Sequence, residues 1–147
     1  MQKKLSLGAI VIAVIVGYFA QQNGTGFDLN AATGNRQSKS TVAQAFSKQQ
    51  SGKQLHGSAK VVKLLPDDLK GIRHQKFIIR VPGGQTLLVA HNIDLAPRIK
   101  GLRKGSQIEF YGEYEWNEKG GVLHWTHHDP QGRHTDGWIK HNGKTYQ

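Results

Sequence analysis

The chain has 147 residues, with 20 Lys and Arg against 10 Asp and Glu, which gives a formal net charge of +10 at pH 7. This length allows one membrane-proximal segment and one small domain, but no second domain. The absence of cysteine excludes a disulfide framework, a thiolate metal site, a cysteine nucleophile and a lipid anchor on cysteine. Because residues 1–53 carry six basic residues and one acidic residue, half of the excess charge precedes the expected domain, whose basic surface should be moderate.

The first 20 residues are predicted to be an export segment. Residues 5–20 carry no charge and follow Lys3 and Lys4. Two interpretations stay open: a signal peptide cleaved after about Ala20, or an uncleaved single-pass anchor. The anchor is favoured because Tyr18 stands where cleavage requires a small residue. Since positive residues stay on the cytoplasmic side, the rest of the chain is expected outside the cytoplasm.

Residues 21–54 are predicted to be a flexible polar linker. They are rich in Gln, Asn, Gly, Ser, Thr and Lys, and such a sequence buries too little apolar surface to offset the entropy lost on ordering. Residues 40–47 fit one short helical turn. The folded domain is therefore expected over residues 55–147.

Short β-rich runs follow at intervals of roughly ten residues, a pattern that favours a small all-β barrel or sandwich. Residues 92–100 break the pattern and are expected to form a turn or a short helix, limited by Pro97. Three strands, a short helical connector and a two-stranded hairpin are the order of an OB-fold, so the predicted fold is a five-stranded OB-like barrel. The predicted strands are residues 58–65, 75–81, 86–91, 107–116 and 121–128.

The predicted fourth strand alternates most clearly. Its aromatic face is most simply core, although Tyr114 and Trp116 could instead stack on bases if that face met solvent. The opposite face would repel a phosphate backbone because it carries three glutamates. The inward set is Ile108, Phe110, Gly112, Tyr114 and Trp116, and the outward set is Glu109, Tyr111, Glu113 and Glu115.

Basic residues on the first two predicted strands are the better candidates for holding an anionic ligand. Their alternative interpretation is a solvated face of a small domain. Three further candidates, two histidines and an arginine, stand at element ends, where barrels commonly display functional groups. The basic candidates are Lys60, Lys63, Lys76 and Arg80, and the element-end candidates are His74, His91 and Arg98.

The densest chemistry lies in residues 123–139, LHWTHHDPQGRHTDGWI, with four histidines and two aspartates. Residues 129–132 are predicted to form a β-turn, after which the returning strand would bring residue 134 opposite residue 127. Two imidazoles and a carboxylate would then converge and suit a divalent transition metal with open positions. The predicted metal ligands are His127, Asp129 and His134.

Two metal-free interpretations of this segment stay open. The first is an acid/base site in which Asp129 or Asp136 orients a histidine and Arg133 holds an anion. The second is a polar hairpin whose histidines satisfy backbone groups around packed tryptophans. Glu113 could join as a carboxylate partner if its face turns toward the cluster. The candidate catalytic residues are His124, His128 and Arg133.

Four stretches of the chain resemble a family of small exported bacterial proteins classed as a domain of unknown function. The stretches are VAHNIDLAPR, EFYGEYEWN, GGVLHWTHHDP and GRHTDGW. The resemblance covers residues 56–147 and brings no established activity, substrate or catalytic residue. It implies a bacterial source and an exported location, hence an inner-membrane protein with its domain in the periplasm, or a periplasmic or secreted one if cleaved.

Three classes of function stay open. The first is a binding module for single-stranded nucleic acid, an anionic glycan or an envelope partner, by analogy with other OB-like barrels. The second is a metal-dependent hydrolase of the nuclease or phosphodiesterase type, with Arg98 or Arg133 holding the anionic group. The third is a structural or assembly factor of the cell envelope. No nucleophile elbow, Walker loop or dinucleotide fingerprint occurs, so those enzyme classes have no support.

Overall fold

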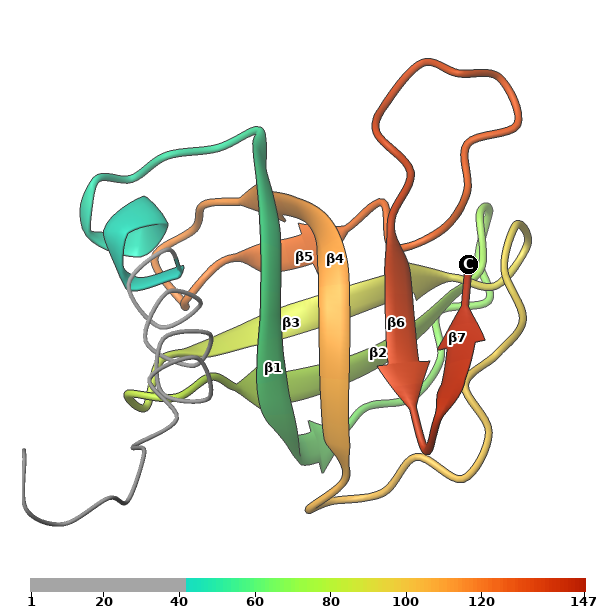
Figure 1. Cartoon of the computed structure of the whole chain (residues 1–147), viewed down its shortest axis with the longest axis horizontal. Helices are drawn as coiled ribbons and strands as arrows, with labels where there is room; N and C mark the ends of the chain where they lie inside the picture. The colour runs from blue at the N-terminus through green and yellow to red at the C-terminus, as the bar shows by residue number, and fades with distance from the viewer. Residues whose placement is uncertain (1–41) are drawn as a thin grey trace, which may run out of the picture.

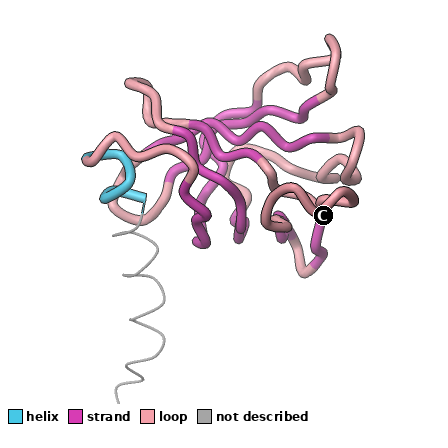
Figure 2. The backbone as a smooth tube through the Cα atoms, turned by 90° about the horizontal axis from the view of Figure 1, so that it is seen from above, coloured by secondary structure: helices cyan, strands magenta, loops and turns pink. Residues whose placement is uncertain are grey.

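The computed structural model describes residues 42–147, in which seven strands and one short helical segment are found. The architecture is all-β, as predicted, and Figure 1 shows β1, β4, β6 and β7 side by side with β2 and β3 behind them. Residues 42–47 are helical and lie at one side of the strands (Figure 2). The strands are β1 (Lys53–Leu64), β2 (His74–Arg80), β3 (Thr86–Asn92), β4 (Gln107–Glu115), β5 (Val122–His124), β6 (Trp138–His141) and β7 (Lys144–Tyr146).

Five of the strands close into a barrel. The order β1-β2-β3-β5-β4 is completed by an antiparallel pairing of β4 with β1. The pairing of β3 with β5 is parallel, and the other barrel pairs are antiparallel. The hairpin of β6 and β7 extends the sheet beyond β4. Because strands pair around the ring, the barrel strands β2, β3 and β5 have no free edge.

The barrel interior is filled by alternate residues of the strands, as the period of two requires. Along β4 the predicted alternation is confirmed: residues 108, 110, 112 and 114 are buried, whereas Glu109 is exposed and residues 111, 113 and 115 are half-buried. Tyr114 is fully buried, so it belongs to the core and cannot stack on a ligand. The larger core side chains are Leu55, Val61, Phe77, Ile79, Leu87, Val89, Ile99, Ile108, Phe110, Tyr114, Leu123 and Ile139.

The first four predicted strands are confirmed as β1 to β4, with β1 beginning at Lys53 instead of residue 58. Of the turn or short helix expected over residues 92–100, the turn is confirmed and the helical connector is wrong, because residues 93–96 form turns and bends. The Asn92 side chain explains the difference, since its Oδ1 accepts hydrogen bonds from the backbone N–H of Asp94 (2.9 Å) and Leu95 (3.2 Å). Such side-chain acceptors compete with the helical backbone pattern.

The predicted β-turn at residues 129–132 is confirmed, since the backbone N–H of Gly132 donates to the carbonyl oxygen of Asp129 (3.1 Å), but the strand pairing predicted around it is wrong. The fifth strand ends at His124, residues 125–137 contain no strand, and the returning strand β6 pairs with β4. Trp125 explains the early end, because its φ of 51° is left-handed and incompatible with an extended strand. The expected pairing of residue 134 with residue 127 therefore does not form.

Part of the predicted linker packs on the barrel. Val42 and Ala45, in the helical segment, are buried and join the hydrophobic core. The predicted export segment, residues 5–20, lies outside the described residues, as does most of the predicted linker. Within residues 42–147, no helix has the length and apolar character needed to span a membrane.

Candidate functional site

Residues 125–137 connect β5 to β6, and Figure 1 shows them projecting as a long loop above β6. The loop begins inside the barrel, where Thr126 is fully buried and its Oγ1 lies 2.8 Å from Nδ1 of His91. Nε2 of His91 lies 3.2 Å from the carbonyl oxygen of Pro97, which can only accept, so Nε2 donates. Burial lowers the pKa of His91 to about 4, and the nearby His127 adds to this shift. His91 is therefore a neutral interior group and not an exposed element-end residue.

Asp129 organises the rest of the loop. Its Oδ1 accepts from the backbone N–H of Gln131 (3.0 Å), and its Oδ2 accepts from those of Arg133 and His134. Its own backbone N–H donates to Oδ1 of Asp136 over 2.7 Å. Although burial alone would raise it, the pKa of Asp129 lies at about 2 because these N–H groups stabilise the carboxylate. Asp129 thus acts as a turn-forming side chain.

Three loop histidines use Nδ1 for local hydrogen bonds. His127 lies 2.7 Å from the carbonyl oxygen of His128, and His134 lies 3.0 Å from that of Thr135. His128 contacts Oδ2 of Asp136 over 2.7 Å, and both side chains are more than half exposed. These bonds fix the rings of His127 and His134 with Nδ1 as donor and leave Nε2 as the acceptor atom.

The structure brings the predicted metal ligands next to one another. The rings of His127 and His134 are 5.4 Å apart, and Nε2 of His134 lies 3.7 Å from Oδ2 of Asp129. Trp125 covers this group, with its ring 3.7 Å from that of His134. Both oxygens of Asp129 already accept backbone hydrogen bonds, so this carboxylate has little capacity left for an ion. A metal at these three residues stays a prediction.

The three candidate catalytic residues do not gather at one point. His124 ends β5 on the outer face of the barrel, whereas His128 pairs with exposed Asp136. Arg133 is exposed and contributes its backbone N–H to Asp129. Within residues 42–147, no hydrogen bond or ion pair joins these three side chains to one another. Their catalytic role is untested by this geometry.

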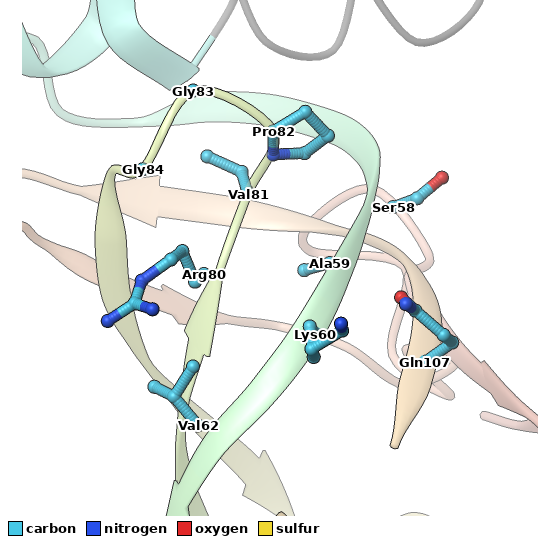
Figure 3. Close-up of a pocket in the computed structure, with 10 residues that line it drawn as sticks. All are labelled: Ser58, Ala59, Lys60, Val62, Arg80, Val81, Pro82, Gly83, Gly84 and Gln107. Atoms are coloured by element: carbon cyan, nitrogen blue, oxygen red, sulfur yellow. The ribbon is translucent and has the colours of Figure 1, made fainter. Parts of the chain in front are cut away.

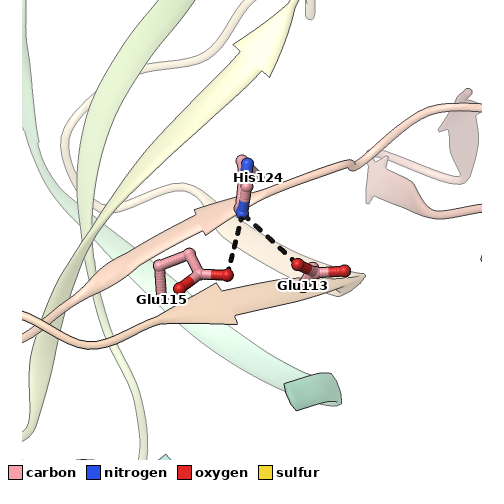
Figure 4. A group of neighbouring side chains, drawn as sticks. All are labelled: Glu113, Glu115 and His124. Atoms are coloured by element: carbon pink, nitrogen blue, oxygen red, sulfur yellow. Dashed lines mark ion pairs between the residues drawn. The ribbon is translucent and has the colours of Figure 1, made fainter. Parts of the chain in front are cut away.

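A second polar group lies on the outer face of β4 and β5 (Figure 4). Nε2 of His124 is 3.9 Å from Oε1 of Glu113 and 3.8 Å from Oε1 of Glu115. Burial, together with the neighbouring carboxylate of Glu115, raises the pKa of Glu113, and burial lowers the pKa of His124. Glu113 does turn toward the histidine cluster, and its partner there is His124.

Three ring-bearing residues lie side by side on the outer face of β1, β4 and β6, and their rings form a triangular cluster. His56 faces Tyr111 in register, and Tyr111 faces Trp138. Their ring centroids are separated by 6.3 Å for His56 and Tyr111, by 6.2 Å for Tyr111 and Trp138 and by 5.5 Å for His56 and Trp138. Lys140 follows on β6, with Nζ 4.6 Å from the ring centroid of Trp138. We call His56, Tyr111 and Trp138 the ring row.

The predicted basic residues Lys60 and Arg80 face each other across β1 and β2 and line a hollow of about 490 Å³ (Figure 3). A second hollow, of about 290 Å³, is lined by Lys140. Ser58 and Gln107 line both hollows, which therefore form one continuous surface. This surface runs from Arg80 to the edge of the ring row.

The other predicted binding residues lie elsewhere. Lys63 is exposed beyond a β-bulge in β1, and Lys76 is half-buried on the outer side of β2. His74 begins β2 and forms an isolated bridge with Asp68. Nε of Arg98 lies 2.9 Å from Oδ2 of Asp67, so this arginine is already paired.

Sequence reasoning missed Glu115 and the ring row. The alternation of β4 does place Tyr111 and Glu115 outward with Glu113, and that signal was present in the sequence. His56 and Trp138 carry no comparable signal, because their proximity to Tyr111 depends on the registers of β1 and β6 against β4. Non-local pairing of this kind is invisible to periodicity.

The described residues define a small all-β barrel protein with an aromatic and basic outer face and an ordered His/Asp loop. A family model described as "Protein of unknown function (DUF3465)" matches residues 28–147. The chain therefore belongs to this family. A search of the curated proteins and a search of the solved structures each gave no match.

Proposed function

We propose that this protein is an exported, membrane-tethered binding module whose OB-like barrel holds an anionic glycan on the outer face of β1, β4 and β6. The OB-like assignment is supported by the closure of β1-β2-β3-β5-β4 on β1, with β3 and β5 parallel. Barrels of that class bind oligosaccharides and oligonucleotides. The membrane tether comes from the uncharged segment at residues 5–20.

The ring row is the observation that carries this proposal. Aromatic rings on a solvent-facing sheet offer flat apolar surfaces against which a sugar ring or a base can lie. The ring row is not enclosed in the core, since His56 is exposed and Tyr111 and Trp138 are half-buried. The three ring centroids stand 5.5–6.3 Å from one another, so the rings form one compact cluster against which a single unit of the ligand can lie.

Cations next to the ring row favour an anionic ligand. Within the described residues, Lys60, Arg80 and Lys140 form no ion pair with a carboxylate. Lys60 and the ring row are separated by four residues along β1, a distance of roughly 13 Å in an extended strand. A short oligomer can therefore reach the rings and the cations together.

The carboxylates on the same face favour a glycan over a nucleic acid. Glu109 is exposed and lies opposite Lys140 in register, between the two ends of the surface. A carboxylate accepts hydrogen bonds from sugar hydroxyls, whereas it repels a phosphate that approaches closely. Single-stranded nucleic acid is accordingly the alternative outcome of the binding test.

The test is calorimetric titration of the full chain with an oligogalacturonate, a neutral maltooligosaccharide of equal length and oligo-dT. We expect the acidic glycan to bind most tightly. Trp138→Ala should weaken its affinity about tenfold or more, which corresponds to at least ~1.4 kcal/mol. Lys60→Gln combined with Arg80→Gln should weaken binding and flatten its salt dependence, since fewer ions are displaced.

Lys119→Gln is the matched control, because Lys119 is exposed in the turn between β4 and β5 and lies outside both hollows of this surface. It should keep the wild-type affinity. Tighter binding of oligo-dT, with the same dependence on Trp138, would replace the glycan by single-stranded nucleic acid. Equal affinity in the wild type and Trp138→Ala would remove the ring row from the proposal.

A further inference from the structure

We propose that Glu113, Glu115 and His124 form a binding site for one divalent transition-metal ion on the outer face of β4 and β5. These are not the ligands that the His/Asp loop suggested. The site is independent of glycan binding, because none of the three residues belongs to the ring row or to the hollows lined by Lys60, Arg80 and Lys140.

Strand geometry places the three ligands. Glu113 and Glu115 are two residues apart on β4 and so project from the same face, and Glu113 faces His124 in the antiparallel pairing with β5. One ligand atom from each residue lies within 4.8 Å of the others. Ligands of a tetrahedral ion bound at about 2.0–2.1 Å stand about 3.3 Å apart. Nε2 of His124 lies 3.8 and 3.9 Å from the two carboxylate oxygens, and a small side-chain adjustment would shorten these separations to about 3.3 Å.

The imidazole has an unused buried atom at this place. Nε2 of His124 is shielded from solvent and has no hydrogen-bond partner within the described part of the chain. The two carboxylate oxygens are too distant to accept a hydrogen bond from it. A buried polar atom without a partner is costly, and an ion between the three side chains would give Nε2 a ligand bond.

The surroundings are those of a metal site and not of a closed ion pair. Oε1 of Glu115 also accepts a hydrogen bond from the backbone N–H of Gly52 (3.2 Å), the residue before β1, which helps to fix this carboxylate. Trp125 shields one side, with its ring centroid 5.5 Å from that of His124. The side chains of Glu113, His124 and Glu115 remain 26%, 31% and 40% exposed, respectively, so solvent can supply further ligands.

The ligand types select the class of ion. One imidazole nitrogen with two carboxylates suits Zn²⁺ or Mn²⁺ better than Mg²⁺ or Ca²⁺, which prefer oxygen alone. Three protein ligands with open positions resemble catalytic and not structural zinc sites. We therefore expect one ion for each chain, with at least one coordinated water.

The test uses Zn²⁺ and Mn²⁺ alone as probes on the full chain after treatment with a chelator. Calorimetric titration should show one site in the wild type, with at least about 100-fold weaker binding in Glu113→Gln and in His124→Gln. His128→Gln is the matched control, since His128 is an exposed histidine of the neighbouring loop, and it should bind as the wild type does. Absence of binding to the wild type would overturn the proposal.

A second outcome would also overturn it: binding that survives in Glu113→Gln but disappears in His134→Gln would place the ion in the loop of residues 125–137. If a variant fails to fold, the position of the ion can still be measured by adding Mn²⁺ to the wild type. The paramagnetic ion should broaden the amide NMR signals of residues 113, 115 and 124 and spare residues 103–106, next to the opposite end of β4. Equal broadening at both ends would refute the site. Titration of Glu113→Gln with the oligogalacturonate tests the proposed function separately, because Glu113 lies outside the glycan surface and its substitution should leave glycan affinity unchanged.

Discussion

Acidification should destabilise the fold through His91. This side chain is fully buried, and burial lowers its pKa from 6.5 to about 4. As the pH falls below 6.5, the unfolded chain binds a proton at His91 and the folded chain does not. The contribution of His91 to the free energy of unfolding is therefore complete above that pH and is lost as the pH falls toward 4. Each pKa unit corresponds to about 1.36 kcal/mol, and we expect His91 to remove about 3 kcal/mol from the free energy of unfolding between pH 7 and pH 4.

Urea denaturation of the full chain at the two pH values measures this loss. His91→Gln should be less stable than the wild type at pH 7, because it disturbs the contacts with Thr126 and Pro97. Its further loss on acidification should be smaller by about 3 kcal/mol, since glutamine does not titrate. His56→Gln, at an exposed histidine, should keep the wild-type difference. Equal acid losses in the wild type and His91→Gln would refute the argument.

Two further predictions concern the loop. A methyl group added at Gly137 would overlap the backbone carbonyl of Trp125, so Gly137→Ala should lower the free energy of unfolding by about 3 kcal/mol. Gly132→Ala meets open space at a φ of 62° and should cost only about 1 kcal/mol; equal losses in urea denaturation would contradict this. Asp129→Ala should accelerate amide hydrogen exchange at residues 131, 133 and His134 while β4 keeps its protection, and unchanged loop rates would exclude the organising role.

The barrel strands were predictable because their signals are local. Alternation along residues 107–115 separates the inner from the outer face without knowledge of any neighbour, and Pro82 with Gly83 and Gly84 marks the turn between β2 and β3. The order of these strands then limits the possible topologies. The helical residues 42–47 were compatible with the sequence, although their packing on the core was not foreseen.

The loop after β5 was predictable at its turn but not in its overall path. Residues 129–132 do form the β-turn that their composition predicts, but Trp125 turns the chain before them, so no hairpin surrounds this turn. The carboxylate of Asp129 then takes backbone donors that a strand would have given to its neighbour. Whether an aspartate satisfies a local backbone or faces a ligand depends on the path of the whole loop, which periodicity does not encode.

The candidate sites were predicted only where one strand carries the signal. Glu113 was identified because its outward direction follows from β4 alone. The ring row and the metal group need pairings between β4 and three other strands, at His56, Trp138 and His124. Tyr114 shows the limit of composition, since an aromatic side chain on this strand fits a core and a stacking surface equally well until the interior is known.

The glutamates on the outer side of β4 have two different kinds of neighbour. Glu109 lies opposite Lys140 in register, and although no ion pair joins the two side chains, opposite charges on neighbouring strands attract each other. Within residues 42–147, neither Glu113 nor Glu115 forms an ion pair with a lysine or arginine, and the neighbour of both is His124. Burial and repulsion from the adjacent carboxylate of Glu115 raise the pKa of Glu113. The proposed cation would offset this repulsion, because it would lie between three ligand atoms that stand within 4.8 Å of one another.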